Sequence, residues 1–481
     1  MVINDLRLYF RNKTAIPILY SVFLCLSVIL INPLGSIKSE IWTEPKLFAI
    51  QLIVILNLWV VLSYIQRNSL VIPTAWKVGF ALWLLFLSVG AISTILSPFP
   101  LRSFWGQINL GDGLFYWCFV AAFVMSNAIV LYLKPELIRY QLYGLLAGGV
   151  ILALAIFIQV YDWRIDFTAT SGQISELRPE MLKSKIWQGQ MPIGFYTNRG
   201  EVALSLAVEG VLALLGLVWG WISAPIAGIA YGLICTALFY TKCRGALLGL
   251  LLALSHFLVL FRSDSNKRVK IICYGFGLLI LSYFIFRASA LVLSPDFTSR
   301  ASPRNFKFNL YNLDSSIGRL QHWKLALKGI AKRPFFGWGF DGFSIAFPFI
   351  ADWTGQHRRY LFDQVNVSEI LSMKTYTFKY IGTDNMVHVG LIMVAKVHNF
   401  ILDTVLSVGI IGLLSYLSLF AYFIWCSFNS TLRGIEASAI AYLVYTMTWY
   451  ESGQFSHLGW WGLSVGLGCT KLLRGKKKQT D

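Results

Sequence analysis

Long apolar stretches alternate with short polar connections along most of the chain, which has 481 residues. The apolar stretches run for roughly 17–25 residues, the length of α-helix that crosses about 30 Å of hydrocarbon at about 1.5 Å per residue. The pattern therefore predicts about twelve transmembrane helices. Their cores lie at 14–33, 47–65, 77–96, 113–133, 138–160, 201–222, 224–241, 244–262, 269–288, 399–426, 434–451 and 457–473.

The last two stretches leave two interpretations open. Glu451 and the glycine at Gly453 interrupt the apolar sequence between them. The two stretches can form a pair of crossing helices, or a re-entrant segment whose irregular backbone is buried within protein.

Composition agrees with the helical pattern. Hydrophobic residues make up 56% of the chain and charged residues 13%, and the mean hydropathy is +0.63. These values exclude an ordinary soluble protein, so we expect an all-α polytopic membrane protein. The seven cysteines lie in or beside apolar stretches and the histidines lack the spacing of metal ligands. We therefore expect neither a disulfide framework nor a metal or other cofactor.

Basic residues in the short connections indicate the orientation, because Lys and Arg accumulate on the cytoplasmic side. In a twelve-helix arrangement these residues fall on one side together with both termini. The predicted organisation is helices one to nine in 1–288 with an outer connection at about 161–200, a large periplasmic loop over 289–397, helices ten to twelve in 398–473, and a basic cytoplasmic tail over 474–481.

The large loop is rich in basic residues. From Arg287 to Lys396 the sequence holds fourteen basic and seven acidic side chains. This excess on the outer side indicates an anionic partner, and attraction to anionic lipid headgroups is the alternative. Apolar residues recurring at three- to four-residue spacing predict an interfacial helix over about 316–332. The segment 350–396 follows no pattern that we could assign.

His398 and Asn399 stand where this polar loop meets the apolar stretch at 399–426. Polar groups at such a boundary often mark chemistry or transport. Arg244 begins another apolar stretch on the same predicted side, and Arg319 begins the interfacial helix. The alternatives are structural: Arg244 extending to the interface, His398 as a hydrogen-bonded interface residue, and Asn399 as a helix cap.

The spacing around these residues resembles that of one enzyme family. Arg244 and Leu248 form an Arg-x3-Leu element, and His398 and Gly409 form a His-x10-Gly element. Both elements are typical of the O-antigen ligase and O-antigen polymerase superfamily, where they lie at periplasmic ends of membrane helices. Further blocks in family order are Phe104-Trp105-Gly106, Gly111-Asp112-Gly113-Leu114, Gly194 to Arg199, Gly318-Arg319 and Arg333 to Gly339.

The resemblance implies a GT-C-like glycosyltransferase in the bacterial cytoplasmic (inner) membrane. Such an enzyme moves a glycan, without a metal, from an undecaprenyl-diphosphate carrier to lipid A-core or another glycan acceptor on the periplasmic side. Guanidinium groups stabilise the leaving diphosphate, and an imidazole with a pKa of about 6.5 accepts the proton of the acceptor hydroxyl. The implied assignments are His398 and Arg244 as catalytic residues, Arg244, Arg319 and Arg199 as diphosphate ligands, and Asn399, Gly409 and Leu248 as supporting residues.

Two other functions stay open. An O-antigen polymerase uses the same donor and differs in its acceptor, which the sequence does not identify. A bicarbonate or other small-solute transporter is the alternative from another class, and it would place ionisable residues deep within its helices. Glu209, inside the stretch at 201–222, fits a transporter, whereas most other charged residues lie at the ends of stretches and favour the enzyme.

Overall fold

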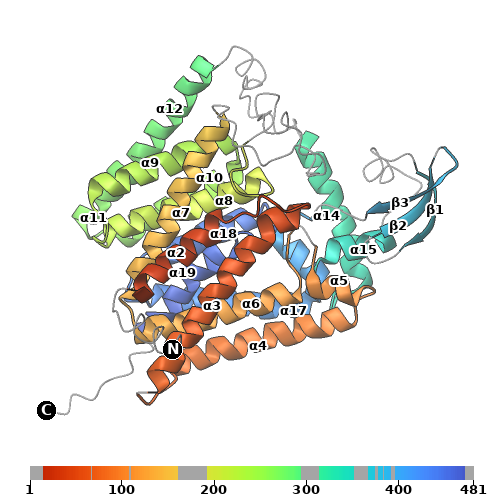
Figure 1. The fold of residues 1–481 in the computed structure, drawn as a ribbon, viewed down its shortest axis with the longest axis horizontal. Helices are drawn as coiled ribbons and strands as arrows, with labels where there is room; N and C mark the ends of the chain where they lie inside the picture. Colours follow the sequence, from red (N-terminus) through yellow and green to blue (C-terminus); the bar gives the residue numbers. More distant parts are fainter. Residues whose placement is uncertain are drawn as a thin grey trace.

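The computed structural model describes residues 15–66, 68–107, 110–160, 192–293, 314–350, 367–373, 377–382, 384–391 and 396–471. Most of these residues are helical, and the helices pack into one bundle (Figure 1). The predicted outer connection at 161–200 is described only from residue 192, and the predicted tail at 474–481 lies outside the described residues.

The elements follow one another as helices with a single small sheet. The helices are α2 (Ala15–Ile29), η1 (Ser39–Thr43), α3 (Glu44–Ile65), α4 (Thr74–Ile95), α5 (Pro100–Trp105), α6 (Leu114–Leu133), α7 (Leu137–Val160), α8 (Arg199–Val218), α9 (Ala224–Thr241), α10 (Arg244–Leu260), α11 (Ser265–Lys270), η4 (Ile271–Gly277), α12 (Leu278–Leu293), α14 (Asp314–Lys332), α15 (Gly342–Ile350), α17 (Phe400–Phe428), α18 (Glu436–Thr446) and α19 (Ser456–Gly468). The strands are β1 (Val367–Met373), β2 (Thr377–Gly382) and β3 (Val387–Leu391).

Each of the predicted apolar stretches contains a helix, but the helices differ in length. Within the described part of the chain, eight helical segments are long and apolar enough to cross a membrane. The helices α2 and α10, with 15 and 17 residues, are apolar but shorter. The structure is therefore that of a mostly helical, polytopic membrane protein, and it supports eight of the twelve predicted crossing helices by length.

The helices α18 and α19 form an antiparallel hairpin that begins and ends at one end of the bundle. Ser430, which precedes α18, pairs with Thr470, which follows α19. With 11 and 13 residues, the two helices are only about 16 and 20 Å long at about 1.5 Å per residue. Each helix by itself is too short to cross about 30 Å of hydrocarbon. The residues that flank α18 nevertheless extend along the whole of α8, since the indole N–H of Trp219 donates to the carbonyl of Arg433 at 3.0 Å and Gly200 lies against Trp449. Both interpretations of this pair therefore stay open.

The helix α8 lies at the centre of the bundle, where its whole membrane-length window is buried. It packs against α9, α10, α18 and α7. Leucine, valine and alanine fill most of its positions, so all its faces can be covered by other apolar helices. Because α8 is central, its first residue, Arg199, is held in a defined place at the end of the bundle.

A three-stranded antiparallel sheet departs from the all-α prediction. Its strand order is β1-β2-β3, and Tyr380 of β2 pairs with His388 of β3. The strands lie in the segment 350–396, to which the sequence analysis assigned no structure. They are short, and Val387 and Val389 are exposed, so no buried face gives a clear two-residue alternation. Asn385, with a φ of 58°, forms part of the turn before β3. Figure 1 shows the sheet beside α15, at one edge of the molecule.

The helix predicted over 316–332 corresponds to α14, which is only partly buried. Leu325 and Ala326 are buried in a small core with residues of α15 and α17, and Trp323 and Ile330 pack against this core. Leu320 and Leu327 are exposed. The apolar residues of α14 are therefore divided between the protein core and the outside, as expected of a helix at a membrane surface.

The helix α17 is interrupted at Gly409, whose φ of 72° is non-helical. The interruption frees backbone groups of α17, and the loop between α14 and α15 pairs with them. The N–H of Ile410 donates to the carbonyl of Pro334 at 2.8 Å, and the N–H of Gly339 donates to the carbonyl of Ser407 at 2.8 Å. The loop therefore replaces the internal hydrogen bonds of the helix and fixes the direction of its first two turns.

We expect Gly409→Ala to lower the thermal stability of the protein. An L-residue in the left-handed region costs roughly 1–2 kcal/mol, and a Cβ at this position would overlap the carbonyl group of Phe335. Gly232→Ala in α9 is the matched control, because nothing lies within 4 Å of a Cβ there and its φ is not positive. Thermal unfolding in detergent, followed by tryptophan fluorescence, measures both. Equal melting temperatures would contradict the assigned kink.

Candidate functional site

The residues that join α18 to α19, 447–455, are named the hairpin tip. The hairpin tip contacts the N-terminal ends of three other helices: Gly200 of α8 lies against Trp449, Gly245 of α10 lies against Thr448, and His398 before α17 packs on Trp449. These helix ends carry most of the residues that the sequence analysis selected. The hairpin tip therefore gathers residues that are as much as 199 positions apart, from 199 to 398.

His398 lies among aromatic rings. Its ring centroid is 4.8 Å from that of Trp449, 5.3 Å from that of Tyr450 and 6.3 Å from that of His322 in α14. Its Nδ1 lies 2.6 Å from the carbonyl oxygen of Lys396. Since a carbonyl oxygen only accepts hydrogen bonds, Nδ1 carries the proton and donates it. The other ring nitrogen, Nε2, is then the lone-pair acceptor of the neutral imidazole.

The surroundings of His398 favour the neutral form of its ring. Burial lowers the pKa of His398 to about 4 from its ordinary value of 6.5. The hydrogen bond to Lys396 opposes this change, and the positive charge of Arg319 and the neighbouring His322 add to it. A neutral imidazole with a free Nε2 lone pair can take a proton from a substrate hydroxyl at neutral pH.

Cationic side chains lie around the same region. Arg319 of α14 is close enough to His398 for its charge to lower the pKa of that ring. Near the N-terminus of α8, burial and then the charge of Arg199 lower the pKa of Lys242. Like charges this close repel each other, and an anion bound between them removes the repulsion. Arg244, exposed at the start of α10, follows Lys242 by two positions.

The helix ends themselves add to this positive region. Arg199 and Arg244 each occupy the first position of a helix, where backbone N–H groups point outward and the helix dipole is positive. Asn198 caps α8 by accepting a hydrogen bond from the N–H of Gly200 at 2.8 Å. Two helix N-termini with guanidinium groups form an environment suited to a phosphate-type anion.

The other predicted site residues have structural positions. Asn399 caps α17, since its side-chain oxygen accepts the N–H of Leu402 at 3.1 Å. Gly409 forms the interruption of α17 and lies against Phe335. Leu248 is exposed on α10, one turn beyond Arg244.

Sequence reasoning missed several residues of this region. His322, Trp449 and Tyr450 surround His398, but their contacts depend on how distant segments fold together. Trp449-Tyr450-Glu451 did give a signal, because two aromatic residues and an acid interrupt an apolar stretch. Lys242 also gave one, because it stands beside Arg244 at the start of a helix.

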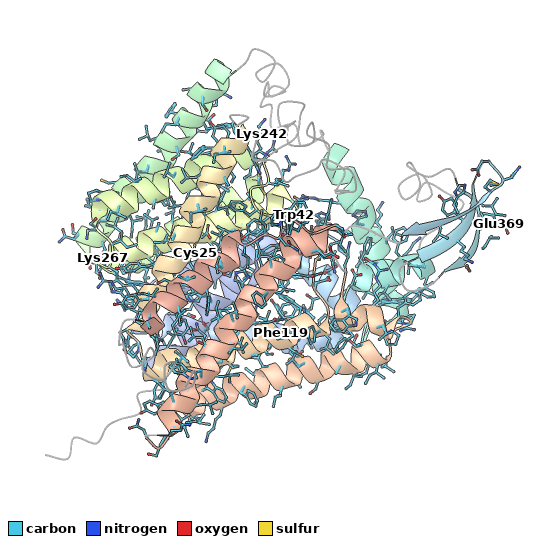
Figure 2. The ribbon with its side chains drawn as sticks, in the orientation of Figure 1. Cys25, Trp42, Phe119, Lys242, Lys267 and Glu369 are labelled. Carbon is cyan, nitrogen blue, oxygen red and sulfur yellow. The ribbon has the colours of Figure 1, made fainter. Side chains whose placement is uncertain are left out.

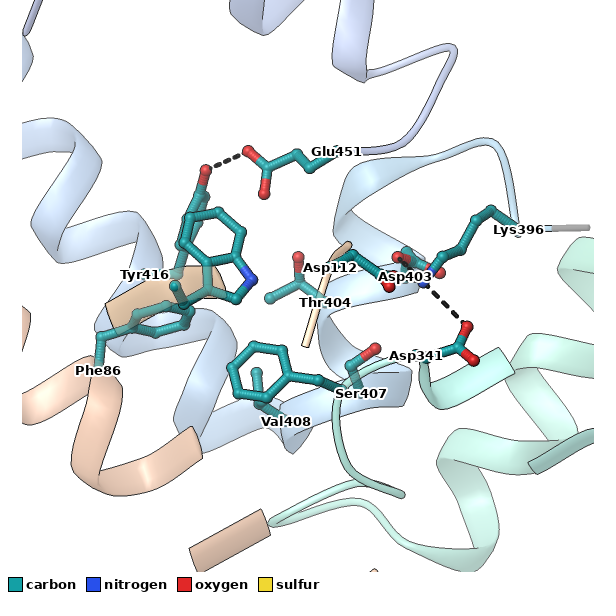
Figure 3. A pocket seen from close by; sticks show the side chains of 12 residues that line it. Phe86, Asp112, Asp341, Lys396, Asp403, Thr404, Ser407, Val408, Tyr416 and Glu451 are labelled. Atoms are coloured by element: carbon teal, nitrogen blue, oxygen red, sulfur yellow. Dashed lines mark hydrogen bonds and ion pairs between the residues drawn. The ribbon is translucent and has the colours of Figure 1, made fainter. Parts of the chain in front are cut away.

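A second polar cluster surrounds Lys396, two residues before His398 (Figure 3). It encloses a cavity of about 30 Å³, which has room for roughly one or two water molecules and not for a sugar. On one side the ammonium of Lys396 pairs with Asp112 and with Asp341, at 3.2 Å in the latter case. On the other side Glu451 accepts the hydroxyl of Tyr416 at 2.6 Å. This cluster has no room for a large substrate, so its role is to hold the residues of the site in place.

The arrangement can perform two chemical tasks. The cations at the ends of α8, α10 and α14 can bind an anionic leaving group, and the Nε2 atom of His398 can accept a proton. Within the described residues, no group of three or more His, Cys, Asp or Glu side chains is arranged to hold a metal ion. These tasks are the ones that transfer between a phosphorylated donor and a hydroxyl acceptor requires.

One comparison with known proteins gives a match. Residues 229–368 match the family model described as O-antigen ligase. The matched region begins within α9, contains α10 with Arg244, and contains α14 with Arg319. No curated protein matches the sequence. The family match confirms the resemblance to the O-antigen ligase superfamily that the sequence motifs indicated.

We expect the His398 ring to stay neutral from pH 8 down to about pH 5, because a pKa lowered to about 4 delays protonation until the pH falls to that value. Ring resonances of protein labelled with ¹⁵N-histidine, titrated in detergent, measure this, and His398→Gln identifies the resonance. Arg319→Gln should raise the pKa of His398, since it removes a repelling charge. A titration midpoint near the ordinary value would contradict the buried site.

Proposed function

We propose that this chain, a member of the O-antigen ligase superfamily by its match over residues 229–368, transfers a glycan from an undecaprenyl-diphosphate carrier to an acceptor hydroxyl. The family itself implies a glycan-transferring enzyme of the ligase or polymerase type. The observation that carries the finer proposal is that His398 packs on the hairpin tip, which also contacts the N-terminal ends of α8 and α10, where Arg199 and Arg244 are exposed. The charge of Arg319 in α14 acts on the same ring.

The cations are suited to a diphosphate. When the bond between the sugar and the diphosphate breaks, negative charge develops on the leaving phosphate oxygen. Arg199 and Arg244 can share this charge through paired N–H donors, which makes a metal unnecessary. Burial, and then the charge of Arg199, lower the pKa of Lys242. A bound diphosphate would place negative charge beside this lysine. Arg319 approaches the same substrate from α14, on the side of His398.

His398 is suited to the acceptor. In the proposed step, the acceptor hydroxyl attacks the anomeric carbon of the glycan while its proton passes to Nε2 of His398. A bond between the acceptor oxygen and the sugar forms, and the bond from the sugar to the diphosphate oxygen breaks. The electron pair leaves with undecaprenyl diphosphate, where the guanidinium groups stabilise it. The proton on His398 then passes to solvent, which restores the neutral ring.

Lipid-facing features suit a donor with a long polyprenyl chain. Leu320 and Leu327 on the exposed side of α14 would lie at the membrane surface, beside the cations that bind the diphosphate. The acceptor in this proposal is lipid A-core or a similar glycan lipid. A polymerase that joins two lipid-linked repeats would use the same residues. The alternative of a small-solute transporter has no support from the family match.

We expect His398→Ala and Arg244→Ala to reduce glycan transfer by about 100-fold or more, the range for losing a general base or a donor to a developing anion. Purified protein in detergent would receive an undecaprenyl-diphosphate-linked oligosaccharide and lipid A-core, with EDTA and no added metal. The product is measured by mass spectrometry. His388→Ala in β3 and Arg262→Ala at the opposite end of α10 are matched controls and should transfer at the wild-type rate.

Two outcomes would contradict the proposal. One is transfer that persists at the wild-type rate in His398→Ala and Arg244→Ala. The other is a folded wild-type protein that transfers nothing to lipid A-core. In the second case, a parallel reaction with lipid-linked oligosaccharide as the only glycan tests the polymerase, which gives products of two or more repeats.

We expect the sheet to lie outside the cytoplasmic membrane and the α10–α11 connection inside. Figure 2 shows Glu369 of β1 and Lys267 of α11 at opposite ends of the molecule. In a chain without native cysteines, Glu369→Cys should react with an impermeant maleimide in spheroplasts, whereas Lys267→Cys should react only after lysis. Both positions are accessible to solvent, because Glu369 is exposed and Lys267 is partly exposed. The reverse labelling would place the site on the cytoplasmic side.

A further inference from the structure

Lys396 lies two residues before His398, and its side chain is buried among carboxylates. Its ammonium pairs with Asp112, lies 3.2 Å from Oδ1 of Asp341 and lies 3.9 Å from Oδ2 of Asp403. Only 2% of the side chain is exposed. A cation buried to this extent is stable only beside such partners, so the position of the ammonium is determined by the carboxylates.

The carboxylates come from separate parts of the fold, and two of them also accept hydrogen bonds from other residues. Asp112 belongs to the connection between α5 and α6, Asp341 directly precedes α15, and Asp403 lies in the first turn of α17. The backbone N–H of Gln107 donates to Asp112 at 2.8 Å, and Nε of Arg102 donates to Asp341 at 2.9 Å. The ammonium thus joins three elements that are already fixed.

The backbone next to Lys396 is held as well. The carbonyl of Lys396 accepts Nδ1–H of His398, and the carbonyl of Val397 accepts the indole N–H of Trp323 at 3.1 Å. His398 itself has a φ of 57°, in the left-handed region that few residues other than glycine adopt. Such a conformation persists when surrounding contacts determine it. Here the contacts are those of Lys396 on one side and of the α17 cap on the other.

We propose that Lys396 is a positioning residue for His398. Its ammonium holds residues 396–399 so that the Lys396 carbonyl keeps the proton on Nδ1 and leaves Nε2 as the acceptor. The inference rests on the proposed function for the use of Nε2 in glycan transfer. The tautomer of His398, in contrast, is a property of the chain that can be measured without any substrate.

A purely structural role is the competing explanation. Buried ion pairs can often be replaced by apolar residues of similar size without loss of stability. If the cluster only joined elements, removing Lys396 and Asp112 together would leave His398 unchanged. If the ammonium positions the ring, the same double change keeps the fold and still releases the ring. The two explanations therefore predict different results for the double variant at Lys396 and Asp112.

Three variants separate these explanations. Lys396→Met removes the charge, and Lys396→Met with Asp112→Asn removes the charge together with its nearest partner. Lys396→Arg keeps the charge, and the cavity of about 30 Å³ beside the cluster gives room for the larger head group. Lys379→Met, at an exposed position of β2, is the matched control. Each full-length protein is purified in detergent, and its melting temperature shows whether it is folded.

The first measurement is the ¹⁵N spectrum of the labelled histidine rings at pH 7. Wild type, Lys396→Arg and Lys379→Met should show His398 with its proton on Nδ1. The double variant should show a mixture of the two tautomers, and so should Lys396→Met if it folds. A folded double variant that keeps the wild-type spectrum would overturn the inference, and so would a wild type protonated on Nε2.

The second measurement is glycan transfer with the undecaprenyl-diphosphate oligosaccharide and lipid A-core. The double variant should lose about 10- to 100-fold in kcat, the range for removing partners that orient an imidazole, with KM for the donor unchanged and an altered pH profile. Lys396→Arg should restore most of kcat. If wild type transfers nothing, the proposed function fails, while the ring spectra still decide whether Lys396 positions His398. A loss in KM alone would overturn the positioning role.

Discussion

The constraint on which the rest of the structure depends is the need to satisfy polar backbone inside an apolar bundle. The hairpin tip is irregular and largely buried, so its polar groups must find partners within the protein. Several of its backbone N–H groups donate to nearby residues, as that of Trp449 does to Thr446, whereas Gly453 and Gln454 pair with distant parts of the chain. The N–H of Gly453 donates to the carbonyl of Leu110 at 2.8 Å, and Gln454 exchanges hydrogen bonds with Thr197 before α8. The same contacts that satisfy the hairpin tip bring the ends of the surrounding helices together.

Polar groups in this protein fall into two kinds, which differ in how their charge is neutralised. In the second polar cluster, the two cations Lys396 and Arg102 are matched by neighbouring carboxylates within hydrogen-bonding networks. Near the surface, the pKa of Lys242 is lowered mainly by burial and then by the positive charge of Arg199. The first kind fixes internal geometry through ion pairs, whereas the second places cations near one another at the ends of helices, a position suited to an anion.

Much of the helical fold could be predicted from the sequence, because apolar stretches of membrane length have few other structures open to them. How far each helix extends across the membrane was harder to predict. The segments on either side of Glu451 have the composition of crossing helices, yet their helices in the structure, α18 and α19, have only 11 and 13 residues. The sheet was not predicted because its strands are short and apolar residues such as Val387 and Val389 are exposed, so no buried face gives a clear two-residue alternation.

The candidate site was only partly accessible to sequence reasoning. His398 and Arg244 were selected through their spacing to Gly409 and Leu248; in the structure Gly409 interrupts α17 and Leu248 is exposed. Lys396 could not be recognised, because nothing in the sequence around it indicates that Asp112, far earlier in the chain, would become its partner.

The interrupted helix α17 has a consequence for the order in which the chain is assembled. A membrane helix normally satisfies its own backbone as soon as it is inserted. The segment around Gly409 cannot satisfy its own backbone in this way, because its hydrogen-bond partners are Pro334 and Gly339. These residues are translated about seventy residues earlier. Insertion of α17 and docking of the preceding loop are therefore one event. His398, which directly precedes the cap of α17, therefore reaches its final position together with that loop.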